Sequence, residues 1–200
     1  MSAHAVIFDL GNVLLHFDYS RAAEKIAKNC SIPEQELLQH LNQSPLLHRF
    51  ETGHITAEEF FNEIRVASCY SGTFETFATE FGDIFWPAEE MIALNEQLQS
   101  EGIPTYIFSN TSPLAVEHIR EQYPFFRHFS GYVLSYEHKA MKPAAAIYEV
   151  VESVTGKSGS QLIYIDDRVE NTDAGALRGW NVILHKSPAL TIPQVRALLG

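Results

Sequence analysis

The sequence predicts an α/β fold, a doubly wound parallel sheet with a helical segment inserted after its first strand. Short apolar runs recur along the chain with helical stretches between them, which is typical of parallel strands buried on both faces. About seventy residues after the first run carry helix signals but no strand-like alternation. A length of 200 residues fits one α/β domain with a modest insertion.

Five short apolar runs predict the strands of the sheet. Each is apolar on both faces, and the stretches between them are long enough to hold crossover helices. The runs are Ala5 to Phe8, Tyr106 to Phe108, Tyr132 to Leu134, Leu162 to Ile165 and Val182 to Leu184.

Two helices of the core are bounded by proline and glycine. One is expected between Pro87 and Gly102 and another between Pro143 and Gly156, each with an apolar stripe at helical spacing. Proline is favoured in the first helical turn and glycine just beyond the last, so these residues mark the helix ends.

The inserted segment, residues 16–86, is expected to form a small helical domain, with residues 1–15 and 87–200 forming the core. Ser31 to Glu34 and Thr56 to Glu59 both have the spacing of a capping box, in which the first side chain and the fourth satisfy free N–H groups at a helix start. Helices are therefore predicted to begin at both places.

Composition argues against several classes of function. The chain has 14 Lys and Arg against 25 Asp and Glu, a formal net charge of -11, which disfavours binding to nucleic acid or anionic membrane surfaces. Its apolar runs fall far short of the roughly 20 residues that cross a bilayer. The start, MSAHAVIFDLGN, lacks a basic, cleavable leader, so a cytoplasmic location is expected. Cys30 and Cys69 are expected to be reduced core thiols.

Polar residues follow the predicted strands where each strand ends. Asp9 follows the first, Ser109 and Asn110 end the second, and the pair Asp166 and Asp167 ends the fourth. The carboxyl ends of parallel strands share one edge of the sheet, where ligands bind in open α/β folds. We therefore expect these side chains to meet, together with Lys142 from the loop after the third strand.

Three carboxylates in one crevice repel each other unless a cation compensates them, and hard oxygen ligands suit Mg²⁺. Lys142 would then attract an anionic substrate, with Ser109 and Asn110 as donors to a phosphate. A carboxylate beside a metal and facing phosphorus can act as a nucleophile.

Four motifs carry a family resemblance. FDLGNVL, FSNTS, KPAAAIYE and IYIDDRVEN resemble, in order and in spacing, the four motifs of the haloacid dehalogenase superfamily, over essentially the whole chain. The fold implied is a Rossmann-like core, and the helical insertion sits where that family places its cap. FDLGNV together with ETGHIT most resembles the alpha-D-glucose-1-phosphate phosphatase group, and also the phosphatase domain fused to some epoxide hydrolases.

The resemblance implies a role for each motif residue. Asp9 would be the nucleophile and a metal ligand, and the backbone carbonyl of Gly11 would be another ligand. Asp167 would bind Mg²⁺ directly and Asp166 through water. Ser109 and Asn110 would hold the phosphoryl group, and Lys142 would neutralise its charge.

One position departs from the family pattern. Phosphatases of the superfamily usually carry an Asp two residues after the nucleophile, as general acid and base, but this chain has Gly11 there. General acid–base catalysis contributes about 10²–10⁴ in rate. Three explanations remain open: a good leaving group such as an anomeric oxygen, substitution by His16 or Asp18, or a reaction without an acid. The first predicts a rate that depends steeply on the leaving group.

The favoured hypothesis is Mg²⁺-dependent hydrolysis of a small phosphate monoester, a sugar phosphate above all, through an aspartyl-phosphate at Asp9. The alternatives are a 2-haloacid dehalogenase with the same nucleophile and a non-enzymatic phosphoacceptor or binding module. For Arg49 and Glu51 of the inserted segment, contact with the substrate is one interpretation, and a solvated helix face is the expected one. The physiological substrate and the oligomeric state stay open.

Overall fold

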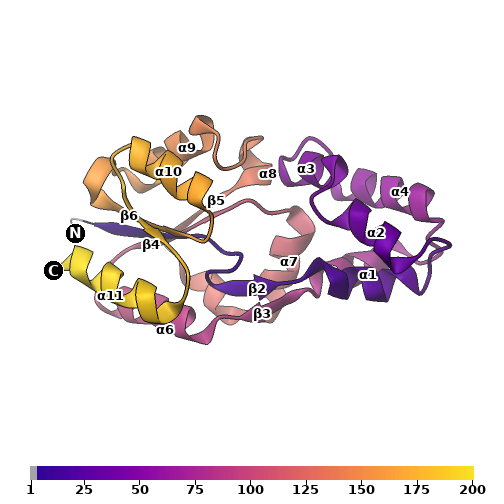
Figure 1. Cartoon of the computed structure of the whole chain (residues 1–200), viewed down its shortest axis with the longest axis horizontal. Coiled ribbons are helices and arrows are strands. Elements are labelled where there is room, and N and C mark those ends of the chain that lie inside the picture. Colours follow the sequence, from indigo (N-terminus) through magenta and orange to yellow (C-terminus); the bar gives the residue numbers. More distant parts are fainter. Residues whose placement is uncertain (1–3) are drawn as a thin grey trace.

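The computed structural model describes residues 4–200. Residues 1–3, which belong to the expected core segment and to the start expected to lack a leader, lie outside the described residues. Its centre is a five-stranded parallel sheet in the order β5-β4-β1-β6-β7, which confirms the predicted doubly wound fold (Figure 1). All five predicted strands are present, and four extend by one or two residues. They are β1 (Ala5–Phe8), β4 (Thr105–Ser109), β5 (Gly131–Leu134), β6 (Leu162–Asp166) and β7 (Asn181–Leu184).

Helices cover both faces of the sheet. In Figure 1, α9 (Ala145–Thr155) and α10 (Val169–Leu177) lie on one face, and α6 (Glu89–Ser100) and α11 (Pro188–Leu199) lie on the other. The remaining elements of the core are short or lie toward its edges. They are α7 (Pro113–Gln122), α8 (Ser135–His138) and the 3₁₀ turns Pro124–His128 and Gly159–Gln161.

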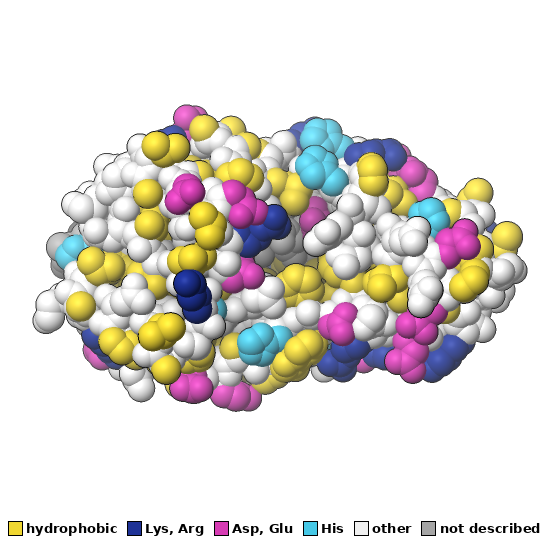
Figure 2. Space-filling model, viewed as in Figure 1, with side chains coloured by type: hydrophobic (Ala, Val, Ile, Leu, Met, Phe, Trp, Pro, Cys, Tyr) yellow, Lys and Arg dark blue, Asp and Glu magenta, His cyan; other side chains and the backbone are white. Residues whose placement is uncertain are grey.

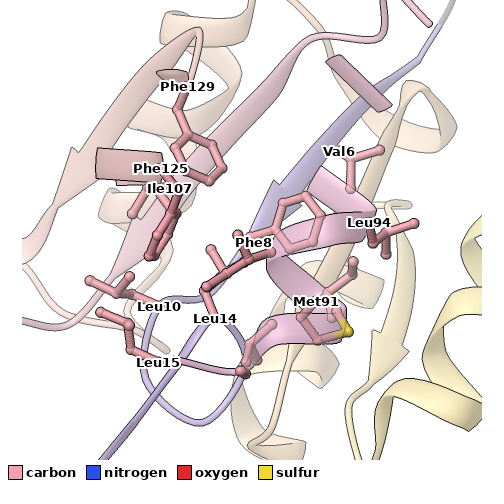
Figure 3. Close-up of a cluster of buried hydrophobic side chains, with 14 of the residues drawn as sticks. Val6, Phe8, Leu10, Leu14, Leu15, Met91, Leu94, Ile107, Phe125 and Phe129 are labelled. Atoms are coloured by element: carbon pink, nitrogen blue, oxygen red, sulfur yellow. The ribbon is translucent and has the colours of Figure 1, made fainter. Parts of the chain in front are cut away.

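The side chains of β1 alternate between two apolar layers. Val6 and Phe8 belong to the cluster that contains Met91 and Leu94 of α6 (Figure 3), whereas Ile7 points to the layer formed by α9 and Tyr164. Successive side chains of a strand point to opposite faces, so a strand in the middle of the sheet must be apolar throughout. Burying one such side chain stabilises the fold by about 1.5–3 kcal/mol.

The inserted segment, called the cap from here on, has its own apolar core. Its helices are α1 (Tyr19–Ala27), α2 (Glu34–Leu41), α3 (Pro45–Glu51), α4 (Ala57–Ser68) and α5 (Phe74–Gly82). Four buried phenylalanines, Phe50, Phe60, Phe77 and Phe81, pack at its centre, and the rings of Phe50 and Phe60 stack with centroids 4.4 Å apart. This core is separate from the two layers on the sheet.

One of the two predicted capping boxes forms. Thr56 and Glu59 satisfy each other's backbone N–H groups at the start of α4, as predicted. The box at Ser31 is wrong, because α2 begins only at Glu34 and its N-cap residue is Pro33, which has no side-chain acceptor. The proline fixes the extended backbone that precedes the helix, so the chain enters α2 without a serine cap.

Two short strands join the cap to the core, and the sequence did not predict them. β2 (Leu15–Phe17) and β3 (Phe85–Pro87) pair antiparallel as a two-stranded ribbon, so both ends of the cap leave the core side by side (Figure 1). Three residues are too few to show an alternating pattern. The predicted boundaries at residues 16 and 86 fall within this ribbon.

No helix among residues 4–200 is long and apolar enough to cross a membrane. Cys30 and Cys69 are free thiols, as expected, but Cys69 is exposed and not part of the core. It is the C-cap residue of α4 in a left-handed conformation, which turns its side chain outward at the end of the helix.

Candidate active site

Three strand ends bring the predicted polar residues together. Asp9 follows β1, Ser109 ends β4 and Asp166 ends β6, and these three strands are neighbours in the sheet. The chain runs outward from β1 to β4 and β5 on one side and then returns to β6 and β7 on the other. The site thus lies where the direction of winding reverses, which is the usual ligand position in such sheets.

Lys142 connects two of the carboxylates. Its side chain is only 1% exposed, and its Nζ lies 2.9 Å from Asp9 Oδ1 and 2.7 Å from Asp166 Oδ2. It also donates to the carbonyl oxygen of Phe108 at 2.9 Å. All three ammonium protons therefore have acceptors, and the lysine holds the ends of β1, β4 and β6 in one fixed cluster.

The cluster carries more negative than positive charge. Burial raises the pKa of Asp9 well above its usual range, and the charge of Lys142 offsets this only in part. Burial also disfavours ionised Asp166, but Lys142 outweighs it and holds the pKa of that carboxyl below its usual value. The pKa of Lys142 is raised, because the two carboxylates overcome its own burial. Asp9 is therefore the group that a further cation would stabilise as a carboxylate.

Asp166 and Asp167 differ in how many partners they have. Besides Lys142, Asp166 accepts hydrogen bonds from the Tyr164 hydroxyl (2.5 Å), the Arg168 N–H (2.9 Å) and the Asn171 amide (2.9 Å). Asp167 is only partly buried, and its Oδ2 accepts from the Asn12 amide at 3.0 Å. Asp167 thus has an oxygen free for direct ligation, whereas the oxygens of Asp166 are occupied.

The donor set fits a hard divalent cation. Asp9, Asp166 and Asp167 each offer one oxygen, and the three oxygens lie within 4.8 Å of one another. In the described part of the chain, both contacts to Asp9, from the Leu10 N–H (2.7 Å) and Lys142, fall on Oδ1 and leave Oδ2 for a ligand. Gly11 lines the same cavity. Carboxylate and carbonyl oxygens with room for water suit Mg²⁺.

Ser109 and Asn110 occupy different positions in this cluster. The buried Ser109 hydroxyl lines the cavity, and its one hydrogen bond, to the carbonyl of the next residue, is long at 3.3 Å. The Asn110 side chain accepts a hydrogen bond from the Lys142 N–H (2.8 Å) and donates one to the Lys142 carbonyl (3.0 Å), so its amide fixes the lysine backbone. Asn110 also lines the cavity, and its predicted contact with a phosphate stays a prediction.

A cavity of about 390 Å³ lies between the core and the cap, next to this cluster. Figure 2 shows it as a hollow between the two lobes of the molecule, with charged side chains at its edge. Sites of this volume hold small organic ligands. The cap residues that line it are Phe17, Tyr19, Asn42, Gln43, Leu47, Glu51 and Phe85.

The structure gives a reason for glycine at position 11. A Cβ atom on Gly11 would lie 2.8 Å from Cε1 of Phe17, whose ring sits where a longer side chain would begin. Phe17 is itself held by the rings of Tyr19 and Phe85, with centroids 5.9 Å and 6.2 Å away. The Phe17 ring, from the two-stranded ribbon of β2 and β3, thus occupies the space where an acidic side chain at position 11 would lie.

Gly11→Asp is therefore expected to destabilise the protein by about 1–3 kcal/mol, the usual cost of forcing extra atoms into a packed site. Phe17→Ala in the same chain should recover part of this loss, because it removes the ring that the new side chain meets. Urea unfolding of the single and double variants measures both effects. A Gly11→Asp variant as stable as the wild-type protein would contradict the packing argument.

Sequence reasoning missed several residues that face the site. The Tyr164 hydroxyl contacts Asp166, and their spacing of two on a strand, which places both on one face, was an available signal. Glu51 lines the cavity, so its expected place on a solvated face is wrong, whereas Arg49 pairs with the exposed Glu63. No periodic pattern distinguishes the two.

The two suggested substitutes for the missing acid lie elsewhere. His16 packs its ring on Trp86, with centroids 5.7 Å apart, and Asp18 caps α1 by accepting from the Ser20 N–H. Neither residue lines the cavity.

Comparisons with known proteins give a matching family model and solved structures of similar fold. A family model described as haloacid dehalogenase-like hydrolase matches residues 3–179. A sesquiterpene phosphatase of Aspergillus oryzae is 26% identical over 98% of this chain and 96% of its own. A haloacid dehalogenase family enzyme of Bacteroides thetaiotaomicron, solved with magnesium and inorganic phosphate, superposes with a TM-score of 0.82 at 22% identity, covering 92% and 94% of the two chains. The L-2-haloacid dehalogenase of Xanthobacter autotrophicus has a TM-score of 0.64 at 16% identity, over 91% and 76%.

Proposed function

Because the chain belongs to the haloacid dehalogenase-like hydrolases, we propose that it is a Mg²⁺-dependent phosphatase that hydrolyses a small phosphate monoester through an aspartyl-phosphate at Asp9. The observation that carries this proposal is the cluster in which Lys142 bridges Asp9 and Asp166 beside the partly exposed Asp167. With all three carboxylates ionised, the cluster carries three negative charges against the one positive charge of Lys142. A divalent cation would cancel the remaining two negative charges and so allow a phosphate dianion to bind.

In the proposed reaction Asp9 attacks phosphorus and the bond to the leaving oxygen breaks, giving an aspartyl-phosphate that water later hydrolyses. Lys142 and the Ser109 hydroxyl would hold the phosphoryl oxygens, with Asn110 keeping Lys142 in place. Bound Mg²⁺, held by Asp9, Asp167 and the carbonyl of Gly11, would offset the charge of the phosphate. Asp166 would contact the metal through a water molecule and would hold Lys142 by its ion pair. Positioning and electrostatics would supply most of the rate.

We propose a sugar phosphate as the substrate. The cap contributes the amides of Asn42 and Gln43 and the carboxyl of Glu51 to the cavity, and such groups bind hydroxyls. A terpenyl monophosphate is the second candidate, favoured by the name of the Aspergillus relative and by the apolar side chains of Phe17, Leu47 and other residues in the lining.

Removal of divalent metal is expected to abolish activity, and Mg²⁺ is expected to restore it. At about 100 times its Kd, Mg²⁺ should stabilise the folded chain by about 2.7 kcal/mol, because it binds the folded site and not the unfolded chain. The assay is phosphate release from a panel of sugar phosphates and a sesquiterpenyl monophosphate, with Tm measured in parallel. Asp167→Asn should remove the gain in Tm, and Asp173→Asn, on the exposed side of α10, should keep it.

Halide release from 2-chloropropionate distinguishes the dehalogenase alternative. Phosphate release that needs Mg²⁺, without halide release, would support the phosphatase. Halide release in chelator, with no phosphate ester hydrolysed, would overturn the proposal.

A further inference from the structure

The proposed reaction needs a proton donor for a poor leaving group, and position 11 has none. The ionisable side chains that line the cavity are Asp9, Tyr19, Glu51, Lys142, Asp167 and Arg168. Asp9, Lys142 and Asp167 form the charge cluster, and Arg168 pairs with Glu170. Only Glu51 and Tyr19 remain, and both come from the cap.

The backbone of Glu51 is tied to the segment that follows β4. Its carbonyl accepts a hydrogen bond of 2.6 Å from the Ser135 hydroxyl, which also accepts from the Thr111 N–H at 2.9 Å. Thr111 is two residues beyond Ser109. One hydroxyl thus links the end of α3 to the strand end where the phosphoryl group would bind, although the two segments lie far apart in sequence.

The chain next to Glu51 approaches the backbone of the core very closely. A Cβ atom on Gly53 would lie 2.1 Å from the carbonyl oxygen of Tyr136, so only glycine permits this approach of the cap to α8. Gly53 has φ of 65°, a left-handed conformation that glycine adopts without strain. The last turn of α3 therefore packs directly on the core, next to the cavity that Glu51 lines.

Among residues 4–200, the carboxyl of Glu51 has no cationic partner. Its contact in the described chain is the Tyr19 hydroxyl, which donates from α1 at 3.4 Å. No hydrogen bond or ion pair joins it to the titratable groups on the other elements that pack on α3, among them His40 of α2, Glu63 of α4 and Tyr136, Glu137 and His138 of α8. Burial raises the pKa of Glu51 to about 7, and the hydrogen bond from Tyr19 opposes this rise. A pKa in this range lets the carboxyl both give and take a proton near neutral pH.

We propose that Glu51 is the general acid and base of this enzyme, a role that rests on the phosphatase function proposed above. As Asp9 Oδ attacks phosphorus, the bond from phosphorus to the leaving oxygen breaks, and that oxygen takes the proton of Glu51 to leave as an alcohol. Glu51 is then a carboxylate, and Asp9 carries the phosphoryl group.

The second half of the reaction returns the proton. The Glu51 carboxylate removes one proton from a water molecule while the water oxygen attacks phosphorus, and the bond from phosphorus to Asp9 breaks. Phosphate leaves, Asp9 is again a carboxylate and Glu51 is again protonated. In this proposal the acidic group comes from the cap, because the ring of Phe17 fills the space that an acidic side chain at position 11 would need.

Glu51→Gln tests this role through the leaving group. An aryl oxygen such as p-nitrophenolate leaves without a proton, so kcat/KM for p-nitrophenyl phosphate should stay within about 3-fold of the wild-type value. For an alkyl phosphate, kcat/KM should fall by about 10²–10⁴, the usual contribution of general acid–base catalysis. The wild-type enzyme should show a shallow dependence of kcat/KM on leaving-group pKa, and the variant a steep one. The shallow dependence proposed for the wild-type enzyme replaces the steep dependence on the leaving group that the sequence, with Gly11 and no other acid, had led us to expect.

Two further readouts separate acid–base catalysis from a structural role. In Glu51→Gln, loss of the base slows hydrolysis of the aspartyl-phosphate, so p-nitrophenyl phosphate should give a burst of one phenolate per active site. The wild-type kcat/KM for an alkyl ester should fall above about pH 7, as Glu51 loses its proton. Tyr19→Phe removes a hydrogen bond that lowers the pKa of Glu51, and should shift this fall to higher pH.

Glu63→Gln is the matched control, because it makes the same change at an exposed cap residue outside the cavity and should leave all these values unchanged. Equal losses on aryl and alkyl esters, or a higher KM with an unchanged leaving-group dependence, would overturn the acid–base role and assign Glu51 to fold or substrate recognition. In either case wild-type phosphatase activity would leave the proposed function intact. A wild-type protein that hydrolyses no phosphate ester would overturn both proposals.

Discussion

Asp9→Asn is expected to lower kcat by a factor on the order of 10³ or more, because an amide cannot form the aspartyl-phosphate. The fold should survive. An Asn Oδ1 still accepts from the Leu10 N–H and from Lys142, and Lys142 keeps Asp166. Burial raises the pKa of Asp9, so its ionised form opposes folding at neutral pH, and a neutral amide removes that cost. Tm should therefore be equal or higher.

The measurements are single-turnover phosphate release and Tm by circular dichroism, both at saturating Mg²⁺ and in chelator. Asp173→Asn makes the same substitution at an exposed position of α10 and should keep full activity. Turnover by purified Asp9→Asn within about 10-fold of the wild-type value would contradict the nucleophile assignment. Loss of activity with a large drop in Tm would mean that Asp9 is needed for the fold.

Lys142→Met is expected to lower the free energy of unfolding by about 3–5 kcal/mol at pH 7, since it leaves two buried carboxylates without a compensating charge. Activity should fall with it. The pKa of Asp166 is below its usual value in the folded protein. Its pairing with Lys142 therefore stabilises the fold at pH values above the usual pKa of an aspartate, and this stabilisation is lost as the pH falls through the lowered pKa. The difference between variant and wild-type protein should therefore shrink below about pH 4.

Urea unfolding between pH 3 and pH 8 measures this difference. Lys186→Met is the control at an exposed lysine and should lie within about 0.5 kcal/mol of the wild-type protein. Adding Asp166→Asn to Lys142→Met removes one of the unpaired carboxylates and should recover part of the stability. A Lys142→Met protein as stable as the wild type at pH 7 would show that the buried cluster does not hold the strand ends together.

Local pattern was enough for the five-stranded sheet and for most of the few helix ends that the sequence analysis predicted. Buried parallel strands must be apolar on both faces, so the runs at Ala5 and Leu162 indicated β1 and β6, and proline and glycine marked the helix ends. The failures were also local. The strands β2 and β3 have three residues each and form only because they pair with each other. Ser31 has the spacing of a cap, but Pro33 decides where α2 begins.

The sequence also determined which residues meet at the sheet edge. Parallel strands place Asp9, Ser109 and Asp166 at the same edge of the sheet, because the carboxyl ends of parallel strands share one edge. That the three residues lie next to each other depends on the strand order, in which β4, β1 and β6 are neighbours. The acidic excess of the cluster and its need for a cation follow from the residue types alone.

Tertiary structure alone decided how these residues are used. Asn12 reaches Asp167 across 155 residues of sequence, the Asn110 amide holds the backbone of Lys142, and the Phe17 ring fills the space beside Gly11. Glu51 faces the cavity because Ser135 and Gly53 seat the end of α3 on the core. Periodicity specifies the face of one element, but contacts between distant elements depend on how the cap packs on the core, and no local pattern records that packing.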